Sequence, residues 1–336
     1  MRGTTHLVQT LCICLISVNY IKRLGGPDDE LKSIQDNLRQ LQHKESLYAV
    51  VENLKVSIST NEVLRNMVHT QENEKVLSWL SLNESQNNHN NARKKHEPTT
   101  GDWFLQSEMF TQWLNSTNSS LWLYGKAGSG KTILCSTIIQ HIIDSTPAVN
   151  CAYFYFDFQV KWKADDMLRS VIVQLCKFKN EIPLELHQLY RQCLNGERRP
   201  QKSSLVRILS LLLTSRTFLL LDALDECTGG ADRNDLLDTI EEIIKTSQNL
   251  NLLATSRKEV DIEKRLKPLF DNRMALEENV VDADIYLYVR RTLTNDDELR
   301  EWDSKTKEEI QDALVKGANG MYDQNITANS VQVQMG

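Results

Sequence analysis

The chain has 336 residues, a formal net charge of −6 at pH 7, and a composition that is 40% hydrophobic and 25% charged. Such values are typical of an ordinary globular protein of about two domains with a sizeable buried core. The acidic balance argues against a general nucleic-acid-binding protein, which usually has a basic face. The seven cysteines are dispersed and form no C-x-x-C pair, which argues against a metal site and favours reduced thiols in a cytoplasmic protein.

The first 80 residues have the pattern of helices. An apolar run from Leu7 to Val18 is too short and too interrupted to span a bilayer. It is interpreted as a buried amphipathic helix or as the core of a signal peptide, and the polar Gln9 and Thr10 favour the helix. Beyond a break at Gly25-Gly26-Pro27, apolar residues recur at helical spacing: Leu31, Ile34, Leu38, Leu41, Leu47, Val51, Leu54 and Ile58. We expect a long amphipathic helix of two segments, which packs as a hairpin or associates with a partner.

Residues 81–99 contain few apolar side chains and many polar ones. Such a composition cannot bury much surface, so this segment is predicted to be a polar linker. Within it, Arg93, Lys94 and Lys95 form a basic cluster. We interpret the cluster as a solvated run of charge and not as a nucleic-acid site.

The stretch 125–132 has the pattern G-x-x-x-x-G-K-[ST] of a phosphate-binding loop. Its residues are Gly125, Lys126, Ala127, Gly128, Ser129, Gly130, Lys131 and Thr132. An apolar strand-like run precedes the loop and a helix-like run follows it, as this motif requires. The glycines let backbone N–H groups surround phosphate oxygens, and the helix N-terminus adds partial positive charge. We expect Lys131 to contact the β- and γ-phosphates of ATP and the Thr132 hydroxyl to bind Mg²⁺.

A second informative stretch begins with the apolar run 217–221, which ends in Asp222. An acid at the carboxyl end of a buried strand lies where an α/β sheet binds its ligand, so Asp222 is the expected partner of Thr132 at Mg²⁺. Asp225 and Glu226 follow closely and are predicted to orient or deprotonate the water that attacks the γ-phosphate. The sequence leaves open which of the two is the base.

A further strand is expected at 251–254, and it leads into Thr255, Ser256 and Arg257. Arg257 is predicted either to sense the γ-phosphate through a charge-assisted hydrogen bond or to pair with a surface acid. Two more strands are expected at 151–156 and 274–276, and helices at 165–175, 184–194, 204–213, 281–293 and 305–316. The predicted fold class is therefore α/β: a P-loop NTPase with a mainly parallel sheet sandwiched by helices and preceded by a small all-α domain.

Four motifs together resemble the NACHT-type P-loop NTPases (STAND class) of fungal NOD-like receptor proteins, whose N-terminal nucleotide domain is called nephrocystin-like. The motifs are the runs 100–105, 121–125, 221–227 and 253–257. The position directly after the Mg²⁺ aspartate, where related ATPases have a glutamate, is Ala223. The resemblance implies a signalling ATPase that hydrolyses ATP slowly, alternates between ADP and ATP states and often forms oligomers. No repeat period of a sensor domain is evident, which predicts a chain truncated before its sensor repeats or one that acts with a separate sensor.

We therefore expect a helical N-terminal domain at 1–80, a polar linker at 81–99, a NACHT-type P-loop NTPase domain at 100–322 and a disordered tail at 323–336. The expected ligands are ATP or ADP with Mg²⁺, in a cytoplasmic protein without nucleic acid or a stable membrane span. A second copy or a partner protein is expected to bind through the N-terminal helices. The alternatives are a small-molecule P-loop kinase that uses Asp157, and a non-catalytic nucleotide-binding adaptor.

Overall fold

The computed structural model describes residues 28–81, 84–146, 149–276, 278–295, 299 and 302–318. The predictions for Leu7–Val18, for Gly25-Gly26-Pro27 and for the tail at 323–336 lie outside these residues. The chain divides into two compact units, residues 1–74 and 75–336. No described helix combines the length and the hydrophobicity that crossing a membrane requires. The domain boundaries expected from the sequence stay predictions.

The first described element is a single helix, α2 (Asp28–Leu80), of 53 residues. The expected pair of helical segments folded as a hairpin is therefore wrong. The physical reason is that residues 28–80 contain neither glycine nor proline, so nothing in this stretch breaks the helical hydrogen-bond ladder. In its last turns, Val76 and Leu80 are buried in the core of the second unit.

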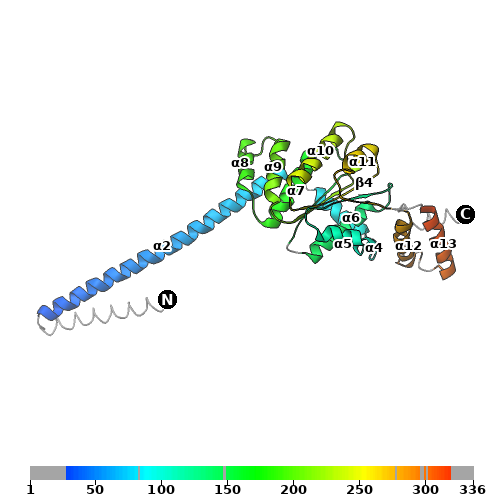
Figure 1. Ribbon diagram of the computed structural model, residues 1–336. Coiled ribbons are helices and arrows are strands. Elements are labelled where there is room, and N and C mark those ends of the chain that lie inside the picture. The colour runs from blue at the N-terminus through cyan, green and yellow to red at the C-terminus, as the bar shows by residue number, and fades with distance from the viewer. Residues whose placement is uncertain are drawn as a thin grey trace. The chain divides into compact units, whose positions relative to one another are not determined.

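The second unit is built on a five-stranded sheet of order β2-β3-β4-β1-β5, in which every neighbouring pair is parallel. The strands are β1 (Ser120–Tyr124), β2 (Asn150–Tyr155), β3 (Thr217–Asp222), β4 (Leu250–Ser256) and β5 (Asn272–Ala275). All five strands expected from the sequence are present, and Figure 1 shows the sheet between its layers of helices. The α/β fold class with a parallel sheet is thus confirmed.

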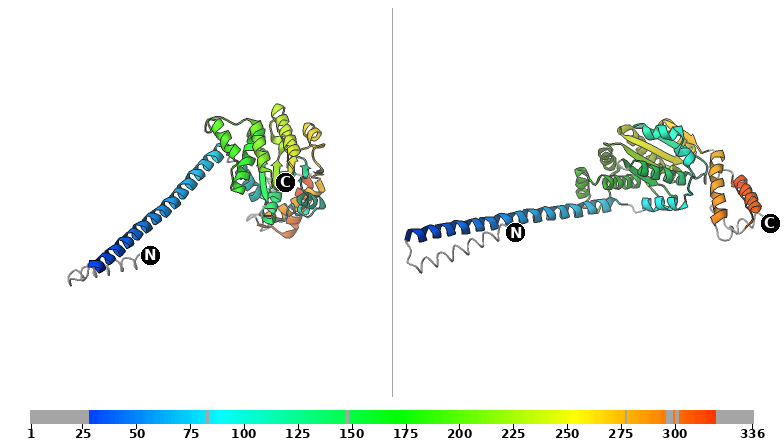
Figure 2. Two further views of the ribbon diagram at one scale, coloured as in Figure 1. Left: turned by 60° about the vertical axis from the view of Figure 1, so that its left-hand side comes forward. Right: turned by 90° about the horizontal axis from the view of Figure 1, so that it is seen from below.

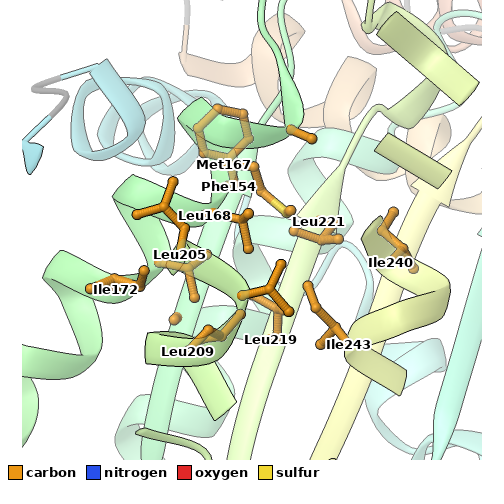
Figure 3. Close-up of a cluster of buried hydrophobic side chains, with 14 of the residues drawn as sticks. Phe154, Met167, Leu168, Ile172, Leu205, Leu209, Leu219, Leu221, Ile240 and Ile243 are labelled. Carbon is orange, nitrogen blue, oxygen red and sulfur yellow. The ribbon is translucent and has the colours of Figure 1, made fainter. Parts of the chain in front are cut away.

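Helices cover both faces of this sheet. Successive side chains of each strand point to opposite faces, and apolar side chains that need burial lie on both. On β3, Leu219 and Leu221 join one buried cluster, whereas Phe218 and Leu220 join the other. Figure 3 shows the first cluster, in which Leu219 and Leu221 face side chains of three helices. Besides the last turns of α2, the helices that supply this cluster are α7 (Ala164–Lys179), α8 (Leu184–Gln192), α9 (Lys202–Leu212), α10 (Ala231–Thr246) and α11 (Val260–Leu266).

The opposite cluster contains a compact group of aromatic rings, among them Phe104, Phe110 and Trp113. It is supplied by α4 (Asp102–Leu105), α5 (Glu108–Asn115), α6 (Lys131–Ser145), α12 (Glu278–Asn295) and α13 (Ser304–Ala318). Figure 2 shows α12 and α13 side by side as a helical pair near the C-terminus. Helices α10 and α11 add to those expected from the sequence.

Within the segment 81–99 that is predicted to be a polar linker, residues 84–95 form a helix, α3 (Glu84–Lys95). The helix packs on α6 and β2 with few apolar groups, because polar and aromatic contacts replace them. His89 is buried, and its Nδ1 lies 2.9 Å from the Tyr155 hydroxyl. One turn later, Arg93 Nη1 donates to Thr137 Oγ1 at 3.4 Å. These contacts were not evident from the run of asparagines.

Because His89 is buried, we expect the stability of the fold to decrease at acidic pH. Burial, and secondly the charge of Arg93, lowers the pKa of His89 from 6.5 to about 4. Between these values the unfolded chain binds a proton that the folded chain does not, so the free energy of unfolding decreases as the pH falls. In His89→Gln, we expect the free energy of unfolding, measured with urea, to decrease less between pH 6.5 and 5 than in the unaltered chain, because the amide does not titrate. The exposed His43→Gln should follow the unaltered chain. Equal slopes for His89→Gln and the unaltered chain would contradict the assignment.

Candidate functional site

A cavity of about 730 Å³ lies at the carboxyl ends of the strands, where open α/β sheets bind their ligands. Its volume is within the range of small-molecule sites. The loop residues that line it are Ala127, Gly128, Ser129, Gly130, Lys131 and Thr132. The acids Asp222, Asp225 and Glu226 and the cation Arg257 line the same cavity. The fold thus gathers residues that the sequence separates by more than 100 positions.

The phosphate-binding loop connects the end of β1 to the first turn of α6. Gly128 and Gly130 have φ values of 73° and 77°, a left-handed conformation that glycine adopts without strain. Gly125 is crowded, since a Cβ there would lie 2.8 Å from Ser129 Oγ and 3.1 Å from Leu276 Cβ. These positions explain why the loop needs glycine at three of its eight residues.

Lys131 lies inside the curve of this loop. Its Nζ donates to the carbonyl oxygens of Gly125 at 3.0 Å and Lys126 at 2.6 Å. Burial lowers the pKa of Lys131, and the charges of Asp225 and Asp222 act in the opposite direction. The ammonium group is thus held against the loop and near the acids of the cavity, where an anionic ligand would meet it.

Asp222 is the last residue of β3 and is 1% exposed. Its Oδ1 accepts a hydrogen bond from Thr255 Oγ1 at 2.7 Å, and Thr255 Oγ1 accepts one from the Ala223 N–H at 2.9 Å. Burial raises the pKa of Asp222, while hydrogen bonds from Thr255 and Thr132 lower it. The sequence did not assign this role to Thr255. The signal is positional, because Leu221 pairs with Ala254 and the two following residues therefore meet.

Both carboxylate oxygens of Asp225 contact Arg257. Oδ2 lies 3.0 Å from Arg257 Nε, and Oδ1 accepts from the Arg257 backbone N–H at 2.8 Å. The Asp225 side chain is 4% exposed, whereas that of Arg257 is 51% exposed and lines the cavity. Of the two expectations for Arg257, pairing with an acid is therefore present, and the acid belongs to the cavity.

Arg233 on α10 connects the two loops that carry these residues. Its Nη2 donates to the Asp225 carbonyl at 2.6 Å, and its Nε donates to the Cys227 carbonyl at 3.3 Å. Its Nη1 pairs with Asp261 at 3.2 Å and also with Glu259. Arg233 thus joins the turn after β3 to the segment after β4. Sequence reasoning missed it because it lies on a helix that was not expected.

Glu226 has a different environment from Asp225. Its Oε2 accepts a hydrogen bond from the Phe158 N–H at 3.3 Å. Burial raises the pKa of Glu226, and the neighbouring carboxylates of Asp225, Asp222 and Asp157 raise it further, while the Phe158 contact lowers it. A carboxylate with a raised pKa is a stronger base than an ordinary glutamate.

The residues fit Mg²⁺ better than a metal that needs a protein cage. The described residues contain no group of three or more His, Cys, Asp or Glu side chains able to hold an ion. Mg²⁺ commonly uses one or two protein oxygens and takes its other ligands from phosphate and water. Thr132 and Asp222, which line the same cavity, can supply these oxygens.

The motifs and this geometry agree with the comparisons of sequence. Residues 99–257 match the family model described as "Nephrocystin 3, N-terminal". The chain is 26% identical over 235 residues to the "Vegetative incompatibility protein HET-E-1" of Podospora anserina. That match covers 66% of this chain but only 17% of the relative, so the chain spans a small part of the relative's length. The resemblance to nephrocystin-like nucleotide domains of fungal NACHT proteins is thus confirmed.

Solved structures give weaker likenesses. Cdc6p from Pyrobaculum aerophilum is 12% identical with a TM-score of 0.39, over 67% of this chain and 64% of that one. DnaA from Aquifex aeolicus, bound to AMPPCP, is 13% identical with a TM-score of 0.37, over 70% and 60%. Similarities at this level add nothing to the fold assignment, which depends on the chain's own sheet.

We expect Arg233→Met to lower the free energy of unfolding by about 2–4 kcal/mol, because it removes a nearly buried guanidinium and leaves the part-buried carbonyls of Asp225 and Cys227 without their donor. Only 11% of the Arg233 side chain is exposed. The control is Arg265→Met. Arg265 pairs with Asp238 and Glu241 nearer the surface and is 31% exposed, so its loss should cost about 1 kcal/mol or less. Urea unfolding measures both variants, and equal effects would contradict the role given to Arg233.

Proposed function

We propose that this chain, which carries a nucleotide domain of the nephrocystin 3 N-terminal type, binds ATP with Mg²⁺, hydrolyses it slowly and acts as a nucleotide-dependent switch. The protein would be of the fungal NOD-like receptor type. One observation carries the proposal. The side chains of Lys131, Asp222, Glu226 and Arg257 line one cavity, and they are residue types that can bind phosphate, ligate Mg²⁺, activate water and contact a γ-phosphate.

Binding requires the loop to exchange one set of partners for another. The Lys131 ammonium, which contacts two loop carbonyls, would turn to the β- and γ-phosphates. The backbone N–H groups of the loop and the first turn of α6 would hold the remaining oxygens. Thr132 and Asp222 would ligate Mg²⁺, which when bound neutralises phosphate charge.

Hydrolysis requires a base for the attacking water, and Glu226 is the better candidate. Both oxygens of Asp225 are engaged by Arg257, so accepting a proton would weaken that pair. Glu226 lines the cavity and has a raised pKa. We assign Glu226 as the base and Asp225 as the residue that positions Arg257.

The switch would act through Arg257. Its guanidinium lines the cavity, and its backbone and Nε are held by Asp225. A γ-phosphate that attracts this guanidinium would compete with Asp225 and shift the segment 257–261, which Arg233 joins to the turn after β3. Contacts to a γ-phosphate drive switches of this kind elsewhere. The fungal relative, described as an incompatibility protein, supports signalling over metabolism.

Lys131→Ala tests nucleotide binding. Removing charge-assisted hydrogen bonds of about 1.5–3 kcal/mol each should lower the affinity for an ATP analogue by ~10- to 100-fold or more. Titration calorimetry of the full chain with Mg²⁺ and a non-hydrolysable analogue measures the change. Unchanged affinity would refute the role of Lys131, and a chain that binds no nucleotide at all would favour the adaptor alternative.

The same preparations test the switch by light scattering. The mass of the unaltered chain should increase with the non-hydrolysable analogue relative to ADP, whereas Lys131→Ala should give one mass with both. Identical masses for the unaltered chain with both nucleotides would contradict an oligomerising switch.

Glu226→Gln should keep nucleotide affinity and lower the rate of phosphate release by roughly 10²–10⁴-fold, the usual contribution of a general base. Asp225→Asn is the matched comparison, and it should lower the rate less while weakening the Arg257 pair. The reverse order of effects would identify Asp225 as the base. A phosphorylated small-molecule acceptor among candidates incubated with ATP would favour the kinase alternative.

A further inference from the structure

One face of α3 lines the nucleotide cavity. Asn88, Asn91, Ala92 and Lys95 all belong to the lining. Their spacing of three, four and seven residues places them on the same side of a helix. Asn87 and Asn90 lie on the same helix but do not line the cavity. The run of asparagines is thus divided into two that face the cavity and two that do not.

The position of α3 is fixed by polar contacts on its neighbouring face. The buried His89 contacts the Tyr155 hydroxyl at 2.9 Å, and its ring centroid lies 4.8 Å from that of Tyr153. Arg93 donates to Thr137 on α6 at 3.4 Å. These contacts attach α3 to β2 and to the helix that follows the phosphate-binding loop.

These contacts also place α3 relative to the acidic residues of the cavity. Tyr155 is the register partner of Asp222 in the neighbouring strand. Tyr155, Phe156 and Asp157 line the cavity together with Asp222 and Glu226. Hence α3 lies beside the acids that would face Mg²⁺ and the terminal phosphate.

We propose that the α3 face formed by Asn88, Asn91 and Lys95 contacts the terminal phosphate of a bound nucleoside triphosphate and so favours triphosphate over diphosphate. The inference rests on the proposed nucleotide binding. It adds α3 to the phosphate-binding loop and the strand ends as a part of the chain that would contact the nucleotide. Carboxamide N–H groups and an ammonium group are donors, and phosphate oxygens are acceptors, so the chemistry is complementary. Ala92, which is 5% exposed, lines the same face and has no polar side-chain group that could compete for the ligand.

The asparagine run supplies a matched experiment. The variant Asn88→Ala/Asn91→Ala removes the two amides that face the cavity, and Asn87→Ala/Asn90→Ala removes the two that do not. Both variants replace asparagine by alanine twice on one helix, so the change in helix propensity is alike. The full chain with Mg²⁺ is titrated calorimetrically with ADP and with a non-hydrolysable ATP analogue.

We expect the cavity-facing variant to lose roughly 10-fold in affinity for the ATP analogue, as hydrogen bonds to a charged group would give. Its affinity for ADP should stay within about 2-fold, and the outward-facing variant should bind both nucleotides as the unaltered chain does. Equal losses for both nucleotides, or no loss for either, would overturn the inference while leaving nucleotide binding intact. If the unaltered chain binds neither nucleotide, the proposed function itself fails and this inference with it. Thermal unfolding followed by circular dichroism identifies a variant that is not folded, and Asn88→Ser/Asn91→Ser then repeats the comparison.

Discussion

A buried carboxylate at the end of β3 is the constraint on which the site depends. Asp222 is almost fully excluded from solvent, and an ionised carboxylate in such a place is costly unless it is hydrogen-bonded or paired. Thr255 on the adjacent strand provides the hydrogen bond and also accepts one from the Ala223 N–H. This arrangement joins the carboxyl ends of β3 and β4, and it places the acid opposite the loop that carries Lys131. The backbone of Asp222 is fixed by the pairing of β3 with β2, in which Asp222 is the partner of Tyr155.

Beyond the sheet, ion pairs and hydrogen bonds join the two loops that leave β3 and β4, in addition to the apolar packing of Leu224 and Ile262 in one buried cluster. Arg233 satisfies carbonyls of one loop and carboxylates of the other, and Asp225 clamps Arg257 across the same gap. Ion pairs that are partly exposed contribute modestly to stability but have defined geometry. Such a connection can be rearranged at lower cost than a packed core, which suits a segment that must respond to a ligand.

The strands and the phosphate-binding loop could be predicted because local patterns determine them. Leu219 and Leu221 belong to a continuous apolar run typical of a doubly covered parallel strand, and the loop glycines meet steric limits of the backbone. The roles of Thr255, Arg233 and α3 could not be predicted from the sequence, because they depend on which segments meet in space. Thr255 becomes a partner of Asp222 only in the strand order β3-β4. Helix α3 has too few apolar residues for a periodic pattern, and its helical state is supported by tertiary contacts such as His89 with Tyr155.

The charges of the cavity explain why these separate parts suit one ligand. Its lining has four cations, Lys94, Lys95, Lys131 and Arg257, and five acids, Glu97, Asp157, Asp222, Asp225 and Glu226. A triphosphate alone would meet a site that is already slightly acidic, so its binding would be opposed near Asp222 and Glu226. A divalent cation would remove that conflict where the acids are, while Lys131 of the loop and Lys95 of α3 would face the phosphate oxygens. Under the proposed function, the charges of this cavity would suit a metal–triphosphate complex better than either component alone.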